Sequence, residues 1–245
     1  MHVRTVAIVM AMRAEARPLI EAFDAVSHPV PVGRPFEWFV ADRDDHRVVI
    51  AVNGVDPRHG VDLVGTEPAV LNTGSVIDAF APDLVMSAGT AGGWQRAGAS
   101  VGDVYVSWPT VVRHDRRIDI DGLREYGIGG HAVWDGAPGL ADRLGARLGV
   151  VTTGNALDES ATDREWILAL DGEVKEMEAA AVAWVCELHD TPFVAVKTIT
   201  DLVDHPTPTG EQFLANLRTA SLRLAHVVPE AVSHWVGGAG SSVDG

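Results

Sequence analysis

The segment Leu84-Val85-Met86-Ser87-Ala88-Gly89-Thr90-Ala91-Gly92-Gly93 decides the fold of this chain. Its first four residues form a short apolar run, which is typical of a strand buried on both faces. The six small residues that follow are expected to form a loop in which backbone N–H groups approach a ligand closely. A buried strand that opens into a glycine-rich segment predicts a ligand site at the carboxyl ends of the strands of an α/β sheet.

Patterns of strand and helix alternate along the rest of the chain. Short apolar runs rich in β-branched residues predict strands, and apolar residues repeated about every 3.6 positions predict helices. This alternation favours an α/β domain with a mainly parallel sheet. The expected strands are residues 6–12, 48–52, 84–87, 103–107 and 193–199, and the expected helices are residues 14–23, 177–188 and 212–228.

Length and composition restrict the class of protein. The 245 residues, 47% of them hydrophobic, suit one large globular domain, which we place at residues 1–235, with a flexible Gly- and Ser-containing tail at residues 236–245. A net charge of −15 argues against nucleic-acid and anionic-membrane partners. No apolar stretch approaches the ~18–20 residues that cross a bilayer, so we expect a cytoplasmic protein. The single cysteine and the unpaired spacing of the ten histidines predict no metal and no cofactor.

Three carboxylates lie where ligand-binding groups are expected. Glu15 falls in the first turn after the first strand, Asp201 follows the strand at residues 193–199, and Glu178 opens an apolar helix. Each has a structural explanation of its own, because acidic residues cap helix N-termini and interact favourably with the helix dipole. The helix that Glu178 opens has an almost entirely apolar face, so a charged carboxylate beside it needs a polar or charged partner. Three carboxylates around one glycine-rich segment together predict a functional site.

Four motifs follow one another along the chain: SAGTAGG at residues 87–93, GASVGDV at 98–104, EMEAAA at 176–181 and KTITD at 197–201. In this order they resemble the nucleoside phosphorylase superfamily. Two further stretches, HDRRI at 114–118 and TGNALD at 153–158, are similar to the plant-type 5′-methylthioadenosine nucleosidases, which the chain resembles most within that superfamily. The similarity runs from about residue 6 to residue 224.

The resemblance implies a three-layer α/β fold with a mixed, partly barrel-like central sheet flanked by helices, in a homodimer. It implies hydrolysis of the N-glycosidic bond of methylthioadenosine to adenine and methylthioribose, a step of methionine salvage, with no cofactor. Asp201 is then the acid that protonates adenine, Glu15 activates water, and Glu178 with Met177 binds the ribose hydroxyls. The remaining implied contacts are Thr90 and Lys197 near the ribose and water, Thr200 beside Asp201, Leu157 and Asp158 at the adenine, and Phe213 and Val55 at the alkylthio group.

These residue types suit the implied chemistry. Adenine is a poor leaving group as an anion, so a proton donor beside it lowers the barrier to C–N cleavage. The transition state resembles an oxocarbenium ion, which nearby carboxylates stabilise in a water-poor pocket. One carboxyl group must stay protonated while another is ionised, and different surroundings separate the two pKa values.

The sequence leaves two rival functions open. A nucleoside phosphorylase would need a basic anion site, and the arginine that related phosphorylases carry ahead of the glycine-rich segment is replaced here by Ser87; Arg13 and Arg17 keep this rival open. A non-catalytic nucleoside-binding protein on the same scaffold is the second. Whether S-adenosylhomocysteine is also a substrate is open as well. The charged excursion at residues 113–130 is the expected dimer contact.

Overall fold

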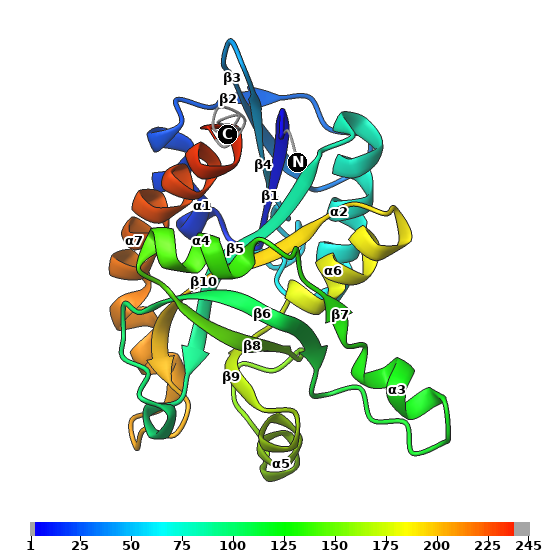
Figure 1. Ribbon diagram of the computed structural model, residues 1–245, viewed down its shortest axis with the longest axis vertical. Coiled ribbons are helices and arrows are strands. Elements are labelled where there is room, and N and C mark those ends of the chain that lie inside the picture. Colours follow the sequence, from blue (N-terminus) through cyan, green and yellow to red (C-terminus); the bar gives the residue numbers. More distant parts are fainter. Residues whose placement is uncertain (1–2, 238–245) are drawn as a thin grey trace, which may run out of the picture.

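Strand β5 (Leu84–Gly93) is the centre of the sheet in the computed structural model, which describes residues 3–237 (Figure 1). The first part of β5 pairs in parallel with β1 on one side and with β10 on the other. The pairing with β10 continues to Gly93, and the last two residues, Gly92 and Gly93, also pair with β9 in the antiparallel direction. The strand therefore belongs both to the open part of the sheet and to a closed part.

The closed part is a five-stranded barrel. Pairing runs from β5 to β10, then to β6, β8 and β9, and returns to β5. The open part continues from β5 through β1 and β4 to β3 and β2. The strands are β1 (Thr5–Met10), β2 (Val26–His28), β3 (Glu37–Asp42), β4 (Arg47–Val52), β5 (Leu84–Gly93), β6 (Val104–Arg113), β7 (His131–Ala132), β8 (Arg147–Thr153), β9 (Gly172–Glu176) and β10 (Phe193–Leu202).

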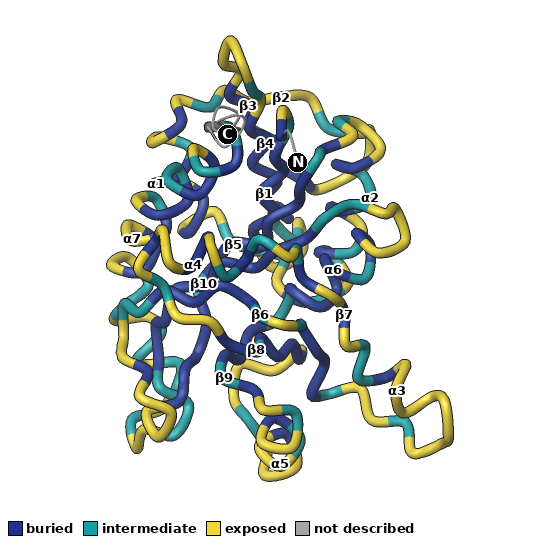
Figure 2. The backbone as a smooth tube through the Cα atoms, in the orientation of Figure 1, coloured by how far each residue is buried: buried dark blue, intermediate teal, exposed yellow. Residues whose placement is uncertain are grey.

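Helices cover both faces of this sheet and complete three layers. Helices α1, α4 and α7 pack together on one side, and α2 packs with α6 on the other (Figure 1). Figure 2 shows that the strands between them are buried, whereas α3 and α5 reach into solvent. The helices are α1 (Arg13–Ala22), α2 (Thr66–Phe80), the 3-10 turn η1 (Gln95–Ala97), α3 (Leu123–Ile128), α4 (Ala137–Leu144), α5 (Ala161–Ala169), α6 (Ala179–Leu188) and α7 (Thr209–Gly237).

The expected three-layer α/β fold with a mixed, partly barrel-like sheet is confirmed. The narrower expectation of a mainly parallel sheet holds only in part: the pairings of β1 with β4 and β5, of β5 with β10, and of β8 with β6 and β9 are parallel. The pairings β10–β6, β5–β9, β6–β7 and the β2–β3–β4 meander are antiparallel. Closing the barrel requires two of these pairings, and an alternation of strands and helices does not reveal them. Among residues 3–237, no helix is both long and apolar enough to cross a membrane.

The expected loop at residues 88–93 is also wrong, since these residues continue β5. The physical reason is close packing. A Cβ atom on Gly92 would lie 2.7 Å from Asp201 Oδ2, and one on Gly93 would lie 2.8 Å from the Cβ of Ala99. Small residues are therefore needed where the strand bends into the barrel and other atoms approach its backbone.

The C-terminal boundary differs slightly from the expected one. Helix α7 runs through Gly237, so Val236 and Gly237 belong to it and not to a tail. The other residues of the expected tail, 238–245, lie outside the described part of the chain. The helix expected at residues 212–228 is the middle of α7, whose face through Leu224, Val228 and Val232 is buried.

Gly54, which follows β4, offers a test of this packing. Its φ is +85°, and an added Cβ would lie 1.7 Å from the carbonyl oxygen of Pro35. We expect Gly54→Ala to lower the free energy of unfolding by more than about 3 kcal/mol, because both backbone strain and a clash oppose alanine. Gly33 is the matched control: its φ is +78° with no atom within 4 Å of an added Cβ, so Gly33→Ala should cost only about 1 kcal/mol in urea unfolding. Equal losses would show that the clash is absent.

Candidate active site

A cavity of about 270 Å³ opens at the carboxyl ends of β1, β5, β9 and β10. Ligands bind at this edge in α/β sheets because loops and helix N-termini converge there. The three carboxylates singled out from the sequence, Glu15, Glu178 and Asp201, all line the cavity. They come from α1, from the residue before α6 and from β10, so the closing of the barrel brings them together.

Glu15 reaches the cavity from the first turn of α1, which begins three residues after β1 ends. Its side chain is buried, and Oε1 accepts hydrogen bonds from the backbone N–H of Thr90 at 2.7 Å and from the Thr90 hydroxyl at 2.6 Å. One carboxylate oxygen is thus fixed to β5. This arrangement holds Glu15 in one position against the wall of the cavity.

Asp201 stands at an irregularity of β10. The pairing of β10 with β5 shifts register between Ile199 and Asp201, so Thr200 is an extra residue in the strand. Such a bulge turns side chains that would otherwise alternate, and Thr200 and Asp201 both line the cavity. The Thr200 hydroxyl donates to Asp201 Oδ1 at 2.8 Å.

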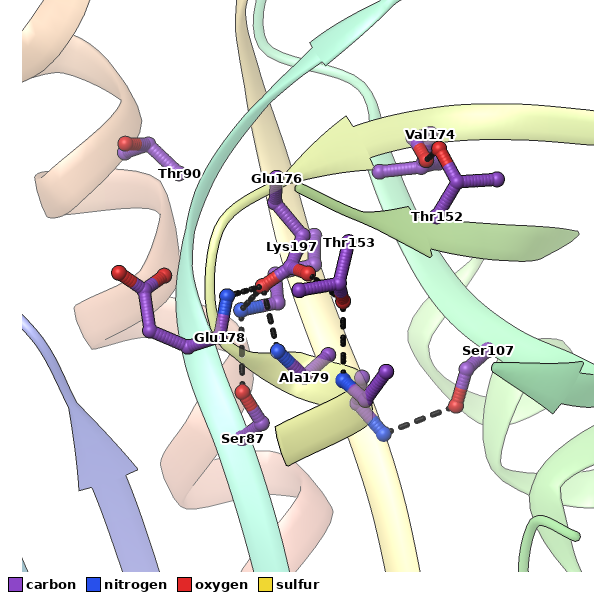
Figure 3. A network of polar contacts seen from close by, with 12 residues as sticks. Ser87, Thr90, Ser107, Thr152, Thr153, Val174, Glu176, Glu178, Ala179 and Lys197 are labelled. Atoms are coloured by element: carbon purple, nitrogen blue, oxygen red, sulfur yellow. Dashed lines mark hydrogen bonds and ion pairs between the residues drawn. The ribbon is translucent and has the colours of Figure 1, made fainter. Parts of the chain in front are cut away.

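Glu178 precedes α6 and accepts a hydrogen bond from the backbone N–H of Gly65 at 2.7 Å. Behind it lies a second acid, Glu176, whose Oε2 is 3.0 Å from Nζ of Lys197. Lys197 also donates to the Ser87 hydroxyl at 3.0 Å. Figure 3 shows this network, with the Glu178 carboxyl turned away from that of Glu176. Two acids two residues apart therefore have different surroundings.

The electrostatics separate these acids further. Burial raises the pKa of Glu15 despite the Thr90 hydrogen bonds, and it raises the pKa of Asp201 against the hydroxyl of Thr200 and the charge of Lys175. Burial and the charge of Glu176 raise the pKa of Glu178 to about 7. Burial alone would do the same to Glu176, but Lys197 and several hydrogen bonds hold the pKa of Glu176 below its ordinary value. The cavity can therefore hold protonated and ionised carboxyl groups side by side.

The structure brings most of the remaining expected site residues to the cavity and leaves two outside. Asp158 is exposed and does not line the cavity. Val55 pairs with Asp62 in the loop after β4, and Val64 from the same loop lines the cavity instead. The lining residues from the expected set are Thr90, Met177, Leu157, Lys197, Thr200 and Phe213. The placements of Asp158 and Val55 rest on loop conformations that short motifs do not specify.

Sequence reasoning missed Lys175 and Glu176 as lining residues. Lys175 is buried and donates to the carbonyl oxygens of Ala156 at 2.6 Å and Leu157 at 2.7 Å, which fixes the loop after β8. The signal for Lys175 was weak: the chain has only two lysines, but Lys175 lies between Glu173 and Glu176, whereas Lys197 lies in an apolar strand-like run. Glu176 gave a weaker signal, because a carboxylate next to Glu178 in the sequence is equally typical of a solvent-exposed residue at the end of a strand.

Comparison with known proteins agrees with this fold and site. The pattern of the phosphorylase superfamily matches residues 5–233. The chain therefore belongs to the phosphorylase superfamily, and the resemblance expected from its motifs is confirmed. It is 38% identical to the 5′-methylthioadenosine nucleosidase of Arabidopsis thaliana, over 94% of this chain and 87% of that protein. It is 40% identical to a 5′-methylthioadenosine/S-adenosylhomocysteine nucleosidase of the same plant, over 91% of this chain and 88% of that protein.

A solved structure supports the same relationship. The structure of the Arabidopsis thaliana 5′-methylthioadenosine nucleosidase superposes with a TM-score of 0.93 at 38% identity, covering 97% of this chain and 98% of that one. Coverage this complete includes both the open part of the sheet and the barrel. The elements that carry the cavity are thus shared and not only the central strands.

The raised pKa of Glu178 predicts that this residue destabilises the fold above neutral pH. Between its ordinary pKa of 4.5 and about 7, the unfolded chain loses the proton first, so stability falls as pH rises. Glu178→Gln removes this penalty and retains an oxygen for the Gly65 N–H. We expect the variant to gain about 2 kcal/mol over the wild type when urea unfolding at pH 8 is compared with pH 5.5.

The control for this measurement is Glu165→Gln, which changes an exposed carboxylate on α5. It should leave the difference in stability between the two pH values as in the wild type. A Glu178→Gln protein that is no more stable than the wild type at pH 8 would mean that the Glu178 carboxyl is already ionised at little cost.

Proposed function

We propose that this protein hydrolyses the N-glycosidic bond of 5′-methylthioadenosine and releases adenine and methylthioribose. The observation that carries the proposal is the convergence of Glu15, Glu178 and Asp201 on one cavity, in a chain whose similar relatives are named methylthioadenosine nucleosidases. The cavity, at about 270 Å³, is close to the lower end of small-ligand sites, ~300 Å³.

The proposed mechanism gives each carboxyl group a separate task. Burial raises the pKa of Asp201, and this residue donates a proton to the adenine. The adenine then leaves as a neutral base. Glu15, fixed by Thr90, holds and activates the attacking water. Glu178 accepts hydrogen bonds from the ribose hydroxyls, and its charge favours the oxocarbenium-like transition state. No metal or cofactor takes part in this scheme.

The cations of the cavity support hydrolysis over phosphorolysis. Lys197 is paired with Glu176, and Lys175 is bound to two backbone carbonyls. Arg13 is exposed and paired with Glu37, and Arg17 is exposed as well, so neither lines the cavity. A phosphate would thus have to displace an existing partner to gain a cation. This weakens the phosphorylase alternative that the two arginines had kept open.

Release of adenine from methylthioadenosine tests the function directly. We expect the purified protein to release adenine at the same rate with and without inorganic phosphate, with free methylthioribose as the second product. Asp201→Asn should lower kcat by about 10²–10⁴-fold, because it removes the proton donor and retains an oxygen for the Thr200 hydroxyl. Adenine release is followed by absorbance or chromatography.

Asp78→Asn is the matched control, since it makes the same change on the exposed side of α2. Phosphate-dependent release with a sugar phosphate as product would establish a phosphorylase. Binding of the nucleoside without release of adenine would establish a binding protein. Comparing kcat/KM for S-adenosylhomocysteine with that for methylthioadenosine then defines the substrate range.

The cytoplasmic location and a role in methionine salvage are part of the same proposal, as is a homodimer. The segment between β6 and β7 projects from the body of the molecule with α3 at its tip (Figure 1). Ile120, Leu123 and Tyr126 in this segment are 60%, 44% and 55% exposed. Three exposed apolar side chains within seven positions support a protein contact there.

Light scattering at micromolar concentration tests the oligomeric state. We expect a mass of twice the 26.0 kDa chain for the wild type, and a shift toward monomer for Leu123→Glu, which places a charge in the proposed contact. Leu168→Glu on α5 is the control, because Leu168 is similarly exposed, at 46%, outside this segment. A monomeric wild type would refute the dimer.

A further inference from the structure

Glu176 is a buried carboxylate with no task in the mechanism above. It is only 4% exposed, at the end of β9. Its Oε2 lies 3.0 Å from Nζ of Lys197 and accepts hydrogen bonds from the backbone N–H groups of Glu178 at 2.9 Å and Ala179 at 2.8 Å. Its Oε1 accepts a hydrogen bond from the Thr153 hydroxyl. These contacts together hold the Glu176 carboxylate in a single position.

The first set of contacts fixes the backbone that carries Glu178. Glu176 binds two successive N–H groups at the start of α6, and the Thr153 hydroxyl accepts the next one, from Ala180, at 2.9 Å. Free N–H groups of a first helical turn need such acceptors. The Glu178 side chain leaves this turn toward the cavity, on the far side from Glu176 (Figure 3). Its direction therefore depends on the turn that Glu176 holds.

The second contact fixes Lys197. Its ammonium group lies between Glu176 on β9 and Ser87 on β5, while the lysine itself belongs to β10. Glu178 and Glu15 are the other acids whose charges act on it. If Glu176 lost its charge, Glu178 would be the acid with the largest remaining charge interaction with the buried Lys197 ammonium group. Glu176 thus keeps Lys197 from neutralising the carboxylate that faces the cavity.

We propose that Glu176 is a positioning residue for the active site, which aims Glu178 through the first turn of α6 and holds Lys197 away from it. The inference rests on the proposed function for its catalytic consequence only. Its electrostatic consequence is a property of the free protein. Glu176 contacts neither substrate nor water in this scheme and acts through Glu178 and Lys197.

The groups that face these residues determine the direction of the effect. Glu176, Lys197 and Glu15 act on Glu178 from β9, β10 and α1, and the Gly65 N–H binds it. Arg113 and His114 lie within range of Glu176 from β6 and the residue after it. Removing the Glu176 charge takes away a repulsion from Glu178 and frees Lys197 to attract it. Both changes lower the pKa of Glu178, which stands at about 7 in the intact site.

Two variants separate charge from geometry. Glu176→Gln keeps an acceptor for the α6 amides but loses the charge that holds Lys197, so we expect the limb of the kcat/KM profile that reports Glu178 to move to lower pH. Lys197, once released, pairs with Glu178 and draws its carboxylate away from the ribose, so kcat/KM for methylthioadenosine should fall by about 10²-fold at pH 7. Glu176→Asp keeps the charge on a shorter side chain that cannot reach Lys197 and both amides together. We expect Glu176→Asp to lose at least tenfold in kcat/KM, while the limb of the pH profile that reports Glu178 stays at the same pH.

A measurement without substrate makes the inference independent of the proposed function. The Glu178 carboxyl is titrated by carbon-13 NMR in protein labelled at glutamate, with its signal assigned from Glu178→Gln. We expect it to titrate at lower pH in Glu176→Gln than in the wild type. If the wild type releases no adenine, the proposed function fails, and this titration alone decides whether Glu176 controls Glu178.

Glu173→Gln is the matched control, on the same strand but outside the cavity lining; it should leave turnover and the Glu178 titration as in the wild type. A merely structural Glu176 would lower the melting temperature and leave the Glu178 titration in place, and that outcome would overturn the inference. A kcat/KM of Glu176→Asp equal to that of the wild type would also overturn the inference. This second test remains valid if Glu176→Gln does not fold.

Discussion

The double role of β5 is the constraint on which the rest of the molecule depends. One strand pairs with β1 in the open sheet, with β10 along its length, and with β9 at its end. The strand must end in very small residues, because a Cβ atom on Gly92 or Gly93 would clash with Asp201 or Ala99 where β5 bends between these partners. The cavity exists because this bend brings the ends of β1, β5, β9 and β10 to one place.

Burial of charge is the second feature that distinguishes this structure. Four acids and two lysines line one cavity, although an ionised group is expensive to bury without a partner. The Glu176–Lys197 pair and the hydrogen bonds around it satisfy one acid completely, whereas Glu15, Glu178 and Asp201 keep raised pKa values. Such an arrangement sacrifices some stability at neutral pH for carboxyl groups poised to exchange protons.

The sequence and the structure agree where a pattern reports a local property. The helix from Ala179 and the buried strand from Phe193 follow from apolar periodicity and from β-branched runs, and both were expected within a few residues. Residues 88–93 were misread because glycine in a sequence marks a turn and a close approach equally well. Asp158 and Val55 were misplaced for a related reason: loop geometry decides which of several neighbouring side chains enters a cavity, and here Val64 does so.

By itself the sequence determined the α/β class and the superfamily and singled out three acids that line the cavity, because strand and helix periodicity and short motifs are encoded by neighbouring residues. Only the tertiary structure decided which strand pairings close the barrel, that Thr200 is an extra residue which turns Asp201 into the cavity, and that Glu176 and Lys197 form a pair beneath Glu178. These features join residues from different strands, and their energies depend on burial and on distances between groups far apart in the chain. Burial and these distances exist only once the chain has folded, so the order of residues alone does not give them.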